Sequence, residues 1–245
     1  MLEKNISIII PCFNESKNLE KLVNRIKIDL KKVDYFVEVI LVNNGSTDDS
    51  QMKIEELLKQ SRSIKVVNLV NNIGYGNGIL AGLSHAKNNF LGWTHADLQC
   101  DFIDCLNGFD ILYKNIQNTG DNYLLKGKRL NRSFLDYFFT KLMSIFVKFF
   151  CKVDLDDINA QPKIFSRKLY NLFENPPKDF LLDFYLMNLS KKYNYKLLNL
   201  DVNFSKRLHG KPKGGGSLIG KIKLSIKTAY YILKYQNGNN YSQNK

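Results

Sequence analysis

The chain of 245 residues lacks the features that mark disulfide-bonded, zinc-binding and membrane-spanning proteins. Its four cysteines include no Cys-x-x-Cys pair, and no Cys and His residues stand at the spacing of a zinc site. There is no run of about 20 apolar residues free of charge, which excludes a membrane-spanning helix. No basic stretch followed by a long apolar one opens the sequence, so we expect no signal peptide and reduced thiols in the cytosol.

Acidic residues are scarce beside basic ones. The sequence holds 36 Lys and Arg against 23 Asp and Glu, which gives a net charge of +13 and a pI near 9.4. This excess favours an anionic partner, such as a nucleotide or an acidic membrane surface. A Lys-rich composition also follows from an AT-rich genome, so the charge alone identifies no partner. No nucleic-acid-binding module is present, and nucleic acid is therefore not expected as a partner.

What the sequence does contain is a regular alternation of strand-like and helix-like segments. Short runs rich in apolar residues predict strands at 6–10, 35–42, 64–70 and 89–94, and the first of them is β-branched. Amphipathic patterns predict the helices between them, at about 17–32, 48–60 and 77–88. Ser46 or Thr47 would cap the second of these helices. The alternation is typical of an α/β protein with a mostly parallel central sheet flanked by helices.

The second half adds helices, strands and basic segments to this pattern. Helices are predicted at 101–118 and 181–192, and strands at 122–129 and 195–204. Four further segments are an amphipathic helix at 133–152, a basic glycine-rich loop at 207–216, a basic amphipathic helix at 217–235 and a disordered tail at 236–245. Because no internal repeat or long linker divides the chain, we expect one domain over residues 1–235.

Three polar loops follow predicted strands, at residues 11–15, 43–48 and 95–101. The carboxyl ends of parallel strands meet at one edge of a sheet, and ligands of such sheets bind there. The third loop lies in the stretch GWTHADLQCD and carries Asp97 and Asp101. An acidic residue at a strand end can hold a divalent metal against a phosphate. The loops therefore indicate one polar site at this edge.

The segments IIIPCFNE, VNNGSTD, NNIGYGNGILAG and HADLQCD resemble glycosyltransferase family 2 in their order and spacing. The later segments GKR, DINAQPKIFSR, LLDFYLMNLSKKYNYK and RLHGKPK extend the resemblance, which looks nearest to the dolichol-phosphate-mannose-synthase branch of polyprenyl-phosphate glycosyltransferases. The resemblance implies a GT-A fold, a Rossmann-like sheet that presents a sugar nucleotide to an acceptor. Residues 1–118 would form its nucleotide-binding half, and residues 119–235 an acceptor-side half.

The resemblance also implies which residues bind the nucleotide-sugar donor, a GDP- or UDP-sugar. They are Pro11, Phe13, Glu15, Val42, Asn43, Asn44, His95, Ala96, Asp97, Arg129, Arg207 and Lys213. Relatives usually carry Asp-Asp where this chain has Asn43-Asn44. Asparagine still accepts hydrogen bonds but also donates them and has no charge, so the preference for the base is expected to differ.

A metal site follows from the same resemblance. The family's Asp-x-Asp motif reads His95-Ala96-Asp97 here, followed by Leu98 and Gln99. Asp97, Gln99 and His95 are the implied ligands of Mg²⁺ or Mn²⁺, and an imidazole ligand favours Mn²⁺. His95 could instead contact a phosphate or a sugar directly, or have no ligand role at all.

On the acceptor side, the resemblance implies that Asp157 and Asp183 are catalytic. A hydroxyl acceptor needs a general base, whereas a phosphate acceptor is already ionised at neutral pH. Segment 133–152 suits either an interfacial membrane helix or a core or homodimer-interface helix. We therefore predict a metal-dependent glycosyltransferase that acts on a polyprenyl phosphate, peripheral to the anionic inner face of the cell membrane. Transfer to a glycan hydroxyl in envelope glycan assembly, and an inactive nucleotide-binding relative, are the alternatives.

Overall fold

The computed structural model describes residues 3–59, 63–130, 157–205, 207, 226 and 230. These residues divide between two compact units. Residues 3–59, 63–130, 160–205 and 207 belong to the first unit, and residues 157–159, 226 and 230 belong to the second. The predicted segments at 133–152 and 236–245 lie outside the described residues, as do Lys213 and nearly all of 217–235. The predicted single domain with halves 1–118 and 119–235 stays a prediction.

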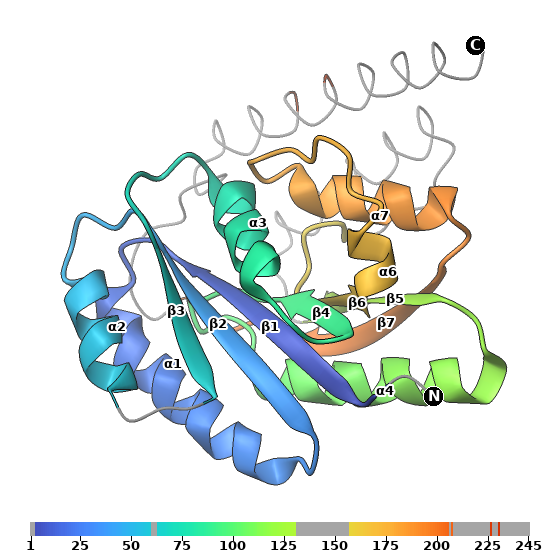
Figure 1. Ribbon diagram of the computed structural model, residues 1–245, viewed down its shortest axis with the longest axis horizontal. Helices are drawn as coiled ribbons and strands as arrows, with labels where there is room; N and C mark the ends of the chain where they lie inside the picture. The colour runs from blue at the N-terminus through green and yellow to red at the C-terminus, as the bar shows by residue number, and fades with distance from the viewer. Residues whose placement is uncertain are drawn as a thin grey trace. The chain divides into compact units, whose positions relative to one another are not determined.

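A sheet of seven strands forms the centre of the first unit, in the order β3-β2-β1-β4-β6-β5-β7 (Figure 1). The strands are β1 (Asn5–Cys12), β2 (Phe36–Asn44), β3 (Ile64–Leu69), β4 (Phe90–Trp93), β5 (Tyr123–Leu130), β6 (Lys163–Ser166) and β7 (Lys196–Asn203). β6 runs antiparallel to both of its neighbours, and all other pairs are parallel. The carboxyl ends of six strands therefore point to one edge.

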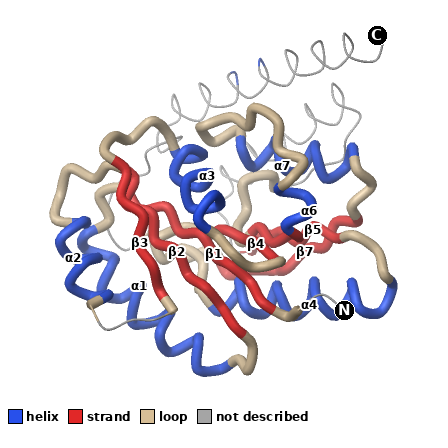
Figure 2. Tube along the Cα trace, viewed as in Figure 1, coloured by secondary structure: helices blue, strands red, loops and turns tan. Residues whose placement is uncertain are grey.

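Helices cover both faces of this sheet. The described helices are α1 (Ser16–Asp29), followed by the 3₁₀ turn η1 (Leu30–Lys32), α2 (Ser50–Leu58), α3 (Tyr75–His85), α4 (Ile103–Thr119), α6 (Arg167–Tyr170) and α7 (Leu182–Lys192). α1, α2 and α4 lie on one face, and α3, α6 and α7 lie on the other (Figures 1 and 2). The predicted α/β architecture with a mostly parallel sheet is confirmed.

β1 shows how the sequence produces these two layers. Successive strand residues point to opposite faces, and β-branched residues suit both. Ile6, Ile8 and Ile10 are fully buried in the hydrophobic core that α1 and α4 share with the sheet. Ile9 faces α3 instead, close to Gly82, where a Cβ would lie 2.4 Å from the Ile9 Cγ2 atom. α3 can approach the sheet this closely only because residue 82 is glycine.

One local prediction is wrong, and one strand was missed. Ser46 and Thr47 do not cap α2, because the residue preceding the helix is Asp49 and it makes no side-chain capping bond. The strand β6 was not predicted from the sequence. In the structure β6 begins directly after Pro162 and fills the gap between β4 and β5.

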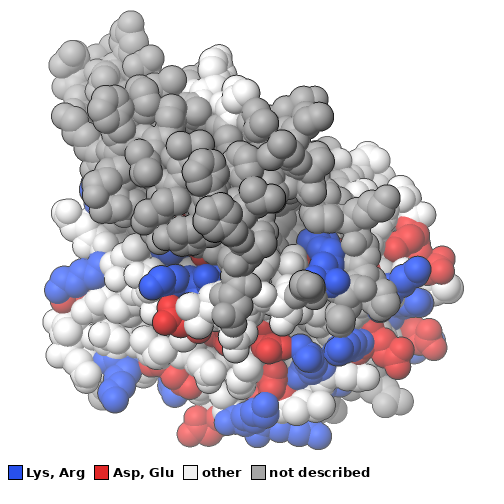
Figure 3. Space-filling view, turned by 180° about the vertical axis from the view of Figure 1, so that it is seen from behind, with Lys and Arg blue, Asp and Glu red and all other residues white. Residues whose placement is uncertain are grey.

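The surface of the described residues carries charges of both signs. On the face seen in Figure 3, Lys and Arg side chains are interspersed with Asp and Glu side chains. Among the residues that the structure describes, no helix is long and apolar enough to span a bilayer.

Candidate functional site

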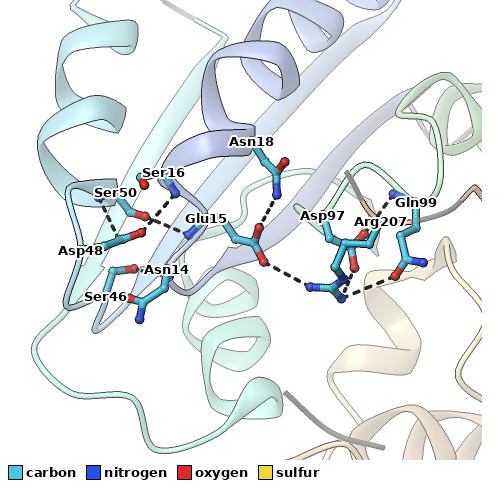
Figure 4. A network of polar contacts seen from close by, with 10 residues as sticks. All are labelled: Asn14, Glu15, Ser16, Asn18, Ser46, Asp48, Ser50, Asp97, Gln99 and Arg207. Atoms are coloured by element: carbon cyan, nitrogen blue, oxygen red, sulfur yellow. Dashed lines mark hydrogen bonds and ion pairs between the residues drawn. The ribbon is translucent and has the colours of Figure 1, made fainter. Parts of the chain in front are cut away.

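The loops that follow β1 and β2 are joined by hydrogen bonds (Figure 4). The Asn14 backbone N–H donates to Ser46 Oγ over 3.1 Å, and Asn14 Oδ1 accepts a bond of 2.8 Å from the Thr47 backbone N–H. The Glu15 backbone N–H donates to Ser50 Oγ over 3.0 Å. These bonds explain why Ser46 and Thr47 are not caps, because their polar atoms hold the neighbouring loop.

Asn43 and Asn44 end β2 and are 1% and 3% exposed. Asn43 Oδ1 accepts from the Ser46 backbone N–H over 3.2 Å, which closes the turn after the strand. Asn44 Nδ2 donates to the Gly74 carbonyl over 3.0 Å, and its Oδ1 is a buried acceptor without a hydrogen-bond partner. The Asn44 side chain therefore presents an unused acceptor at the strand end, as an aspartate would, without the charge.

Pro11, Val42 and Phe13 belong to the same edge but differ in exposure. Val42 is fully buried, and Pro11 and Phe13 are half-buried. A Cβ on Gly78 would lie 3.2 Å from the Pro11 Cβ, and one on Gly82 would lie 3.0 Å from a Val42 methyl group, so both side chains lie beneath α3. The donor contacts predicted for these three residues stay predictions.

The loop after β4 places Asp97 next to Arg207. Arg207 Nη2 donates to Asp97 Oδ2 over 2.6 Å, and the same nitrogen lies 3.5 Å from Gln99 Oε1 (Figure 4). Arg207 Nη1 lies 3.7 Å from Glu15 Oε1. Asp97 Oδ1 is turned inward, where it accepts from the Gln99 backbone N–H over 3.1 Å. Four residues predicted for the donor or metal site thus meet at one guanidinium group.

These contacts bear on the predicted metal site. Two side-chain oxygens, Asp97 Oδ2 and Gln99 Oε1, already share one cation, the Arg207 guanidinium. Within the described ranges no group of three or more His, Cys, Asp and Glu side chains lies close enough to hold a metal ion. Asp97 and Gln99 offer oxygen ligands of the kind that Mg²⁺ and Mn²⁺ accept, and the metal site predicted for Asp97, Gln99 and His95 stays a prediction.

His95 lies on the other side of this loop, against an aromatic pair. Its ring centroid is 5.5 Å from that of Tyr75, which stacks on Phe180 at 4.7 Å. Burial lowers the pKa of His95 and outweighs the nearby charges of Asp97 and Asp183, which would raise it. His95 is therefore neutral at pH 7 and can offer one N–H donor or one nitrogen lone pair. Ala96, between His95 and Asp97, is buried in the core.

Asp183, at the start of α7, is held through a single oxygen. Trp93 Nε1 donates to its Oδ1 over 3.1 Å, Gln161 Nε2 donates to the same atom over 3.0 Å, and Lys163 Nζ lies 3.6 Å from it. All four side chains are at most 1% exposed. Trp93 and Lys163 were missed from the sequence. The signal available was the single tryptophan directly before the His95 loop.

The remaining predicted residues lie in other places. Arg129, near the end of β5, stacks over the Phe204 ring at 5.1 Å, so it stands beside the chain that leads to Arg207. Asp157 belongs to the second unit and has a positive φ of 49°. The phosphate role predicted for Arg129 and the catalytic role predicted for Asp157 stay predictions.

Comparisons of sequence point to one family. Residues 7–121 match the family described as glycosyl transferase family 2. The chain is 28% identical over 166 residues to CsbB of Bacillus subtilis (strain 168), whose name describes a glycosyltransferase; the match covers 68% of this chain and 49% of CsbB. It is 35% identical over 115 residues to an uncharacterised glycosyltransferase of Synechocystis, covering 44% of this chain and 36% of that protein. The chain thus spans half or less of the length of these two relatives.

The fold is similar to that of crystal structures of glucosyl-3-phosphoglycerate synthase from Mycobacterium tuberculosis. The complex with Mn²⁺, UDP and glucosyl-3-phosphoglycerate has a TM-score of 0.69 at 15% identity, and covers 96% of this chain and 80% of that one. The complex with phosphoglyceric acid has a TM-score of 0.72 at 14% identity, with the same coverage. At such identities the likeness concerns the fold, and it confirms the predicted GT-A fold. The chain therefore has the GT-A fold, and its residues 7–121 match glycosyl transferase family 2.

Proposed function

We propose that this chain transfers a sugar from a UDP- or GDP-sugar to a polyprenyl phosphate, as a peripheral protein at the cytoplasmic face of the membrane. The observation that carries the donor half is the meeting of Asp97, Gln99, Glu15 and Arg207 at the carboxyl edge of the sheet. Oxygen ligands and a guanidinium side by side suit a nucleoside diphosphate. Solved structures of the same fold hold UDP or UDP-glucose together with Mn²⁺, which supports this assignment.

The residues at this edge would have different roles in binding the donor. Asp97 and Gln99 would hold Mg²⁺ or Mn²⁺, which neutralises the charge that develops on the departing diphosphate. Arg207 would donate to phosphate oxygens in the planar geometry that guanidinium offers. His95, neutral and half-buried, would donate to the sugar or a phosphate without adding charge. Asn44 would orient the nucleoside with its unused acceptor.

The proposed acceptor rests on charge. Residues 206–245 contain nine Lys and Arg and no Asp or Glu, so this end of the chain suits an anionic lipid and its membrane. A polyprenyl phosphate needs no general base, since its second pKa of about 6 leaves it largely ionised at pH 7. Segment 133–152, predicted as an interfacial helix, would add apolar contact with the membrane surface.

One observation favours a second acceptor class, a sugar hydroxyl. Asp183 Oδ1 accepts hydrogen bonds from Trp93 and Gln161 and forms an ion pair with Lys163, an arrangement that fixes the carboxylate as a general base requires. The polyprenyl phosphate and the sugar hydroxyl can be distinguished by the product that each acceptor yields. Radiolabelled sugar enters a butanol-extractable lipid if the acceptor is a polyprenyl phosphate, and stays out of it if the acceptor is a glycan.

The donor site is tested first by nucleotide binding. We expect one diphosphate among UDP, GDP, CDP and dTDP to raise the melting temperature with Mg²⁺ or Mn²⁺ and much less with EDTA. At about 100 times the dissociation constant, a ligand stabilises the folded state by about 2.7 kcal/mol, which a thermal shift detects. Asp97→Asn should abolish the metal dependence, because it removes the charge that the ion needs.

The matched control is Asp101→Asn. Asp101 lies on the same loop, but it is exposed and pairs with Arg25 on the surface. The Asp101→Asn variant should bind nucleotide as the unmodified chain does. A shift without sugar turnover would identify an inactive nucleotide-binding relative, and no shift with any diphosphate would contradict the proposed donor.

A further inference from the structure

Arg207 stands between two carboxylates that come from different strands. Glu15 follows β1 and Asp97 follows β4, while Arg207 follows β7 (Figure 4). The side chains of Arg207, Glu15 and Asp97 are 20%, 13% and 6% exposed. Because water screens these charges little, the contacts among them are stronger than those of a surface ion pair.

The chain around Arg207 is tied to the acidic loop. The Ser205 backbone N–H donates to the Gln99 carbonyl over 2.9 Å, and Gln99 Nε2 donates back to the Ser205 carbonyl over 3.1 Å. These two bonds lie two residues before Arg207. They keep the guanidinium group close to Asp97, whether Arg207 pairs with Asp97 or with a bound phosphate.

The pairing of Arg207 leaves one donor unused. Its Nε–H is buried and has no hydrogen-bond partner, while Nη2 is taken by Asp97 and Gln99. A buried donor without a partner destabilises the arrangement that contains it. A phosphate has oxygens enough to accept from both edges of a guanidinium group, so an arriving diphosphate offers Arg207 a better set of partners than Asp97 alone.

We infer that Arg207 is a tethered cation that competes with the divalent metal ion for Asp97 Oδ2 and releases this atom when the donor diphosphate arrives. The inference rests on the proposed function, since it concerns the same donor site. A metal ion alone would have to displace the guanidinium and then face its positive charge at close range. A diphosphate supplies negative oxygens to both cations at once. Metal and nucleotide therefore bind together, and each binds weakly alone.

The consequence is a coupling between the two ligands that depends on Arg207. By linkage, UDP must strengthen Mn²⁺ binding by the same factor by which Mn²⁺ strengthens UDP binding. We expect a factor of at least about ten, within the usual range of such couplings. Arg207→Gln removes the competing charge, so Mn²⁺ alone should bind several-fold more tightly, while the coupling factor should fall to the part that phosphate ligands of the ion supply.

The experiment is titration of the full chain with MnCl₂, followed by electron paramagnetic resonance of the free ion, with and without saturating UDP or GDP. Arg207→Lys is a second variant, which keeps the charge but cannot bridge two acceptors, and its coupling should lie between the other two. Arg25→Gln is the matched control, because Arg25 pairs with Asp101 of the same loop at the surface. Its Mn²⁺ affinity and coupling should equal those of the unmodified chain.

Two results would overturn the inference. If Arg207→Gln and Arg207→Lys fold, bind nucleotide and keep the original Mn²⁺ affinity and coupling, Arg207 does not compete with the metal, and the proposed donor site stands without it. If neither nucleotide binds the unmodified chain at any Mn²⁺ concentration, the proposed function fails and the inference fails with it.

Discussion

At the scale of single residues, the role of the Asp183 carboxylate is what distinguishes the two proposed acceptor classes. Three donors hold its Oδ1 atom, and these residues are essentially inaccessible to water. Such an anchored carboxylate can be a general base or a structural ion pair. The two roles predict different losses of activity when asparagine replaces Asp183, which removes the charge but keeps the shape of the side chain.

For a polyprenyl phosphate acceptor we expect Asp183→Asn to lower kcat less than about tenfold, since the nucleophile is already ionised. A loss of about 10²–10⁴-fold is typical of a missing general base and would favour a hydroxyl acceptor. The measurement is the initial rate of sugar transfer to extractable lipid and to glycan. Asp121→Asn, which breaks the exposed pair with Lys196, is the control and should transfer at the unmodified rate.

The sequence predicted which residues share this edge of the sheet but not their contacts. Glu15, Asp97, Gln99 and Arg207 were each predicted by motif, and the structure brings them together. The pairing itself joins positions 110 residues apart, which no local pattern records. Trp93 and Lys163 were missed for the same reason, because their strand positions predict burial and their polar partner is on a distant helix.

At the scale of elements, the approach of α3 to the sheet depends on Gly82. A Cβ there would lie 2.4 Å from Ile9 Cγ2 and 3.0 Å from Val42 Cγ2, both in the core. Alanine favours a helix over glycine by about 1 kcal/mol, but overpacking costs about 1–3 kcal/mol. Because the 2.4 Å contact puts the overpacking cost in the upper part of its range, we expect Gly82→Ala to lower the free energy of unfolding by about 1–2 kcal/mol, measured by urea denaturation.

The control for this substitution is Ser84→Ala, on the exposed side of the same helix. It changes helix propensity without touching the sheet, and should leave stability within about 0.5 kcal/mol. A Gly82→Ala variant as stable as the unmodified chain would contradict the close packing described here.

Elements with strong periodicity were predicted well, and those decided by distant partners were not. β1 to β5, β7 and the long helices lie within a few residues of their predicted positions, because β-branched runs and amphipathic faces are local signals. β6 has four residues beside a proline and owes its pairing to β4 and β5. The predicted cap of α2 was wrong, because the hydroxyls of Ser46 and Thr47 accept hydrogen bonds from Asn14 instead.

At the scale of the whole molecule, the net charge of +13 is unevenly spread along the chain, since residues 206–245 hold nine basic and no acidic residues. We expect the chain to sediment with vesicles that contain phosphatidylglycerol and not with phosphatidylcholine alone. Each basic residue near such a surface contributes about 1 kcal/mol. Binding should be lost at high salt, where the screening length falls from about 10 Å at 0.1 M to about 3 Å at 1 M.

Charge-reversal variants test whether residues 206–245, rather than the rest of the chain, attract the membrane. The test variant changes three lysines to glutamate, Lys221, Lys223 and Lys227, and should lose most vesicle binding. The control changes three exposed lysines of the described surface to glutamate, Lys21, Lys31 and Lys59. Equal losses in the two variants would mean that overall charge, rather than the carboxyl-terminal segment, attracts the membrane.

The reversed strand β6 has a consequence for how such proteins diversify. The chain leaves the sheet after Leu130 on β5 and re-enters it at Lys163 on β6, and these two strands are neighbours in which Lys126 pairs with Lys163. The segment between these two strands starts and ends on neighbouring strands of one sheet. The loops that follow β1 and β4 lie outside it. Insertions and deletions in this segment can therefore accumulate over generations while the loops that carry Glu15 and Asp97 stay unchanged.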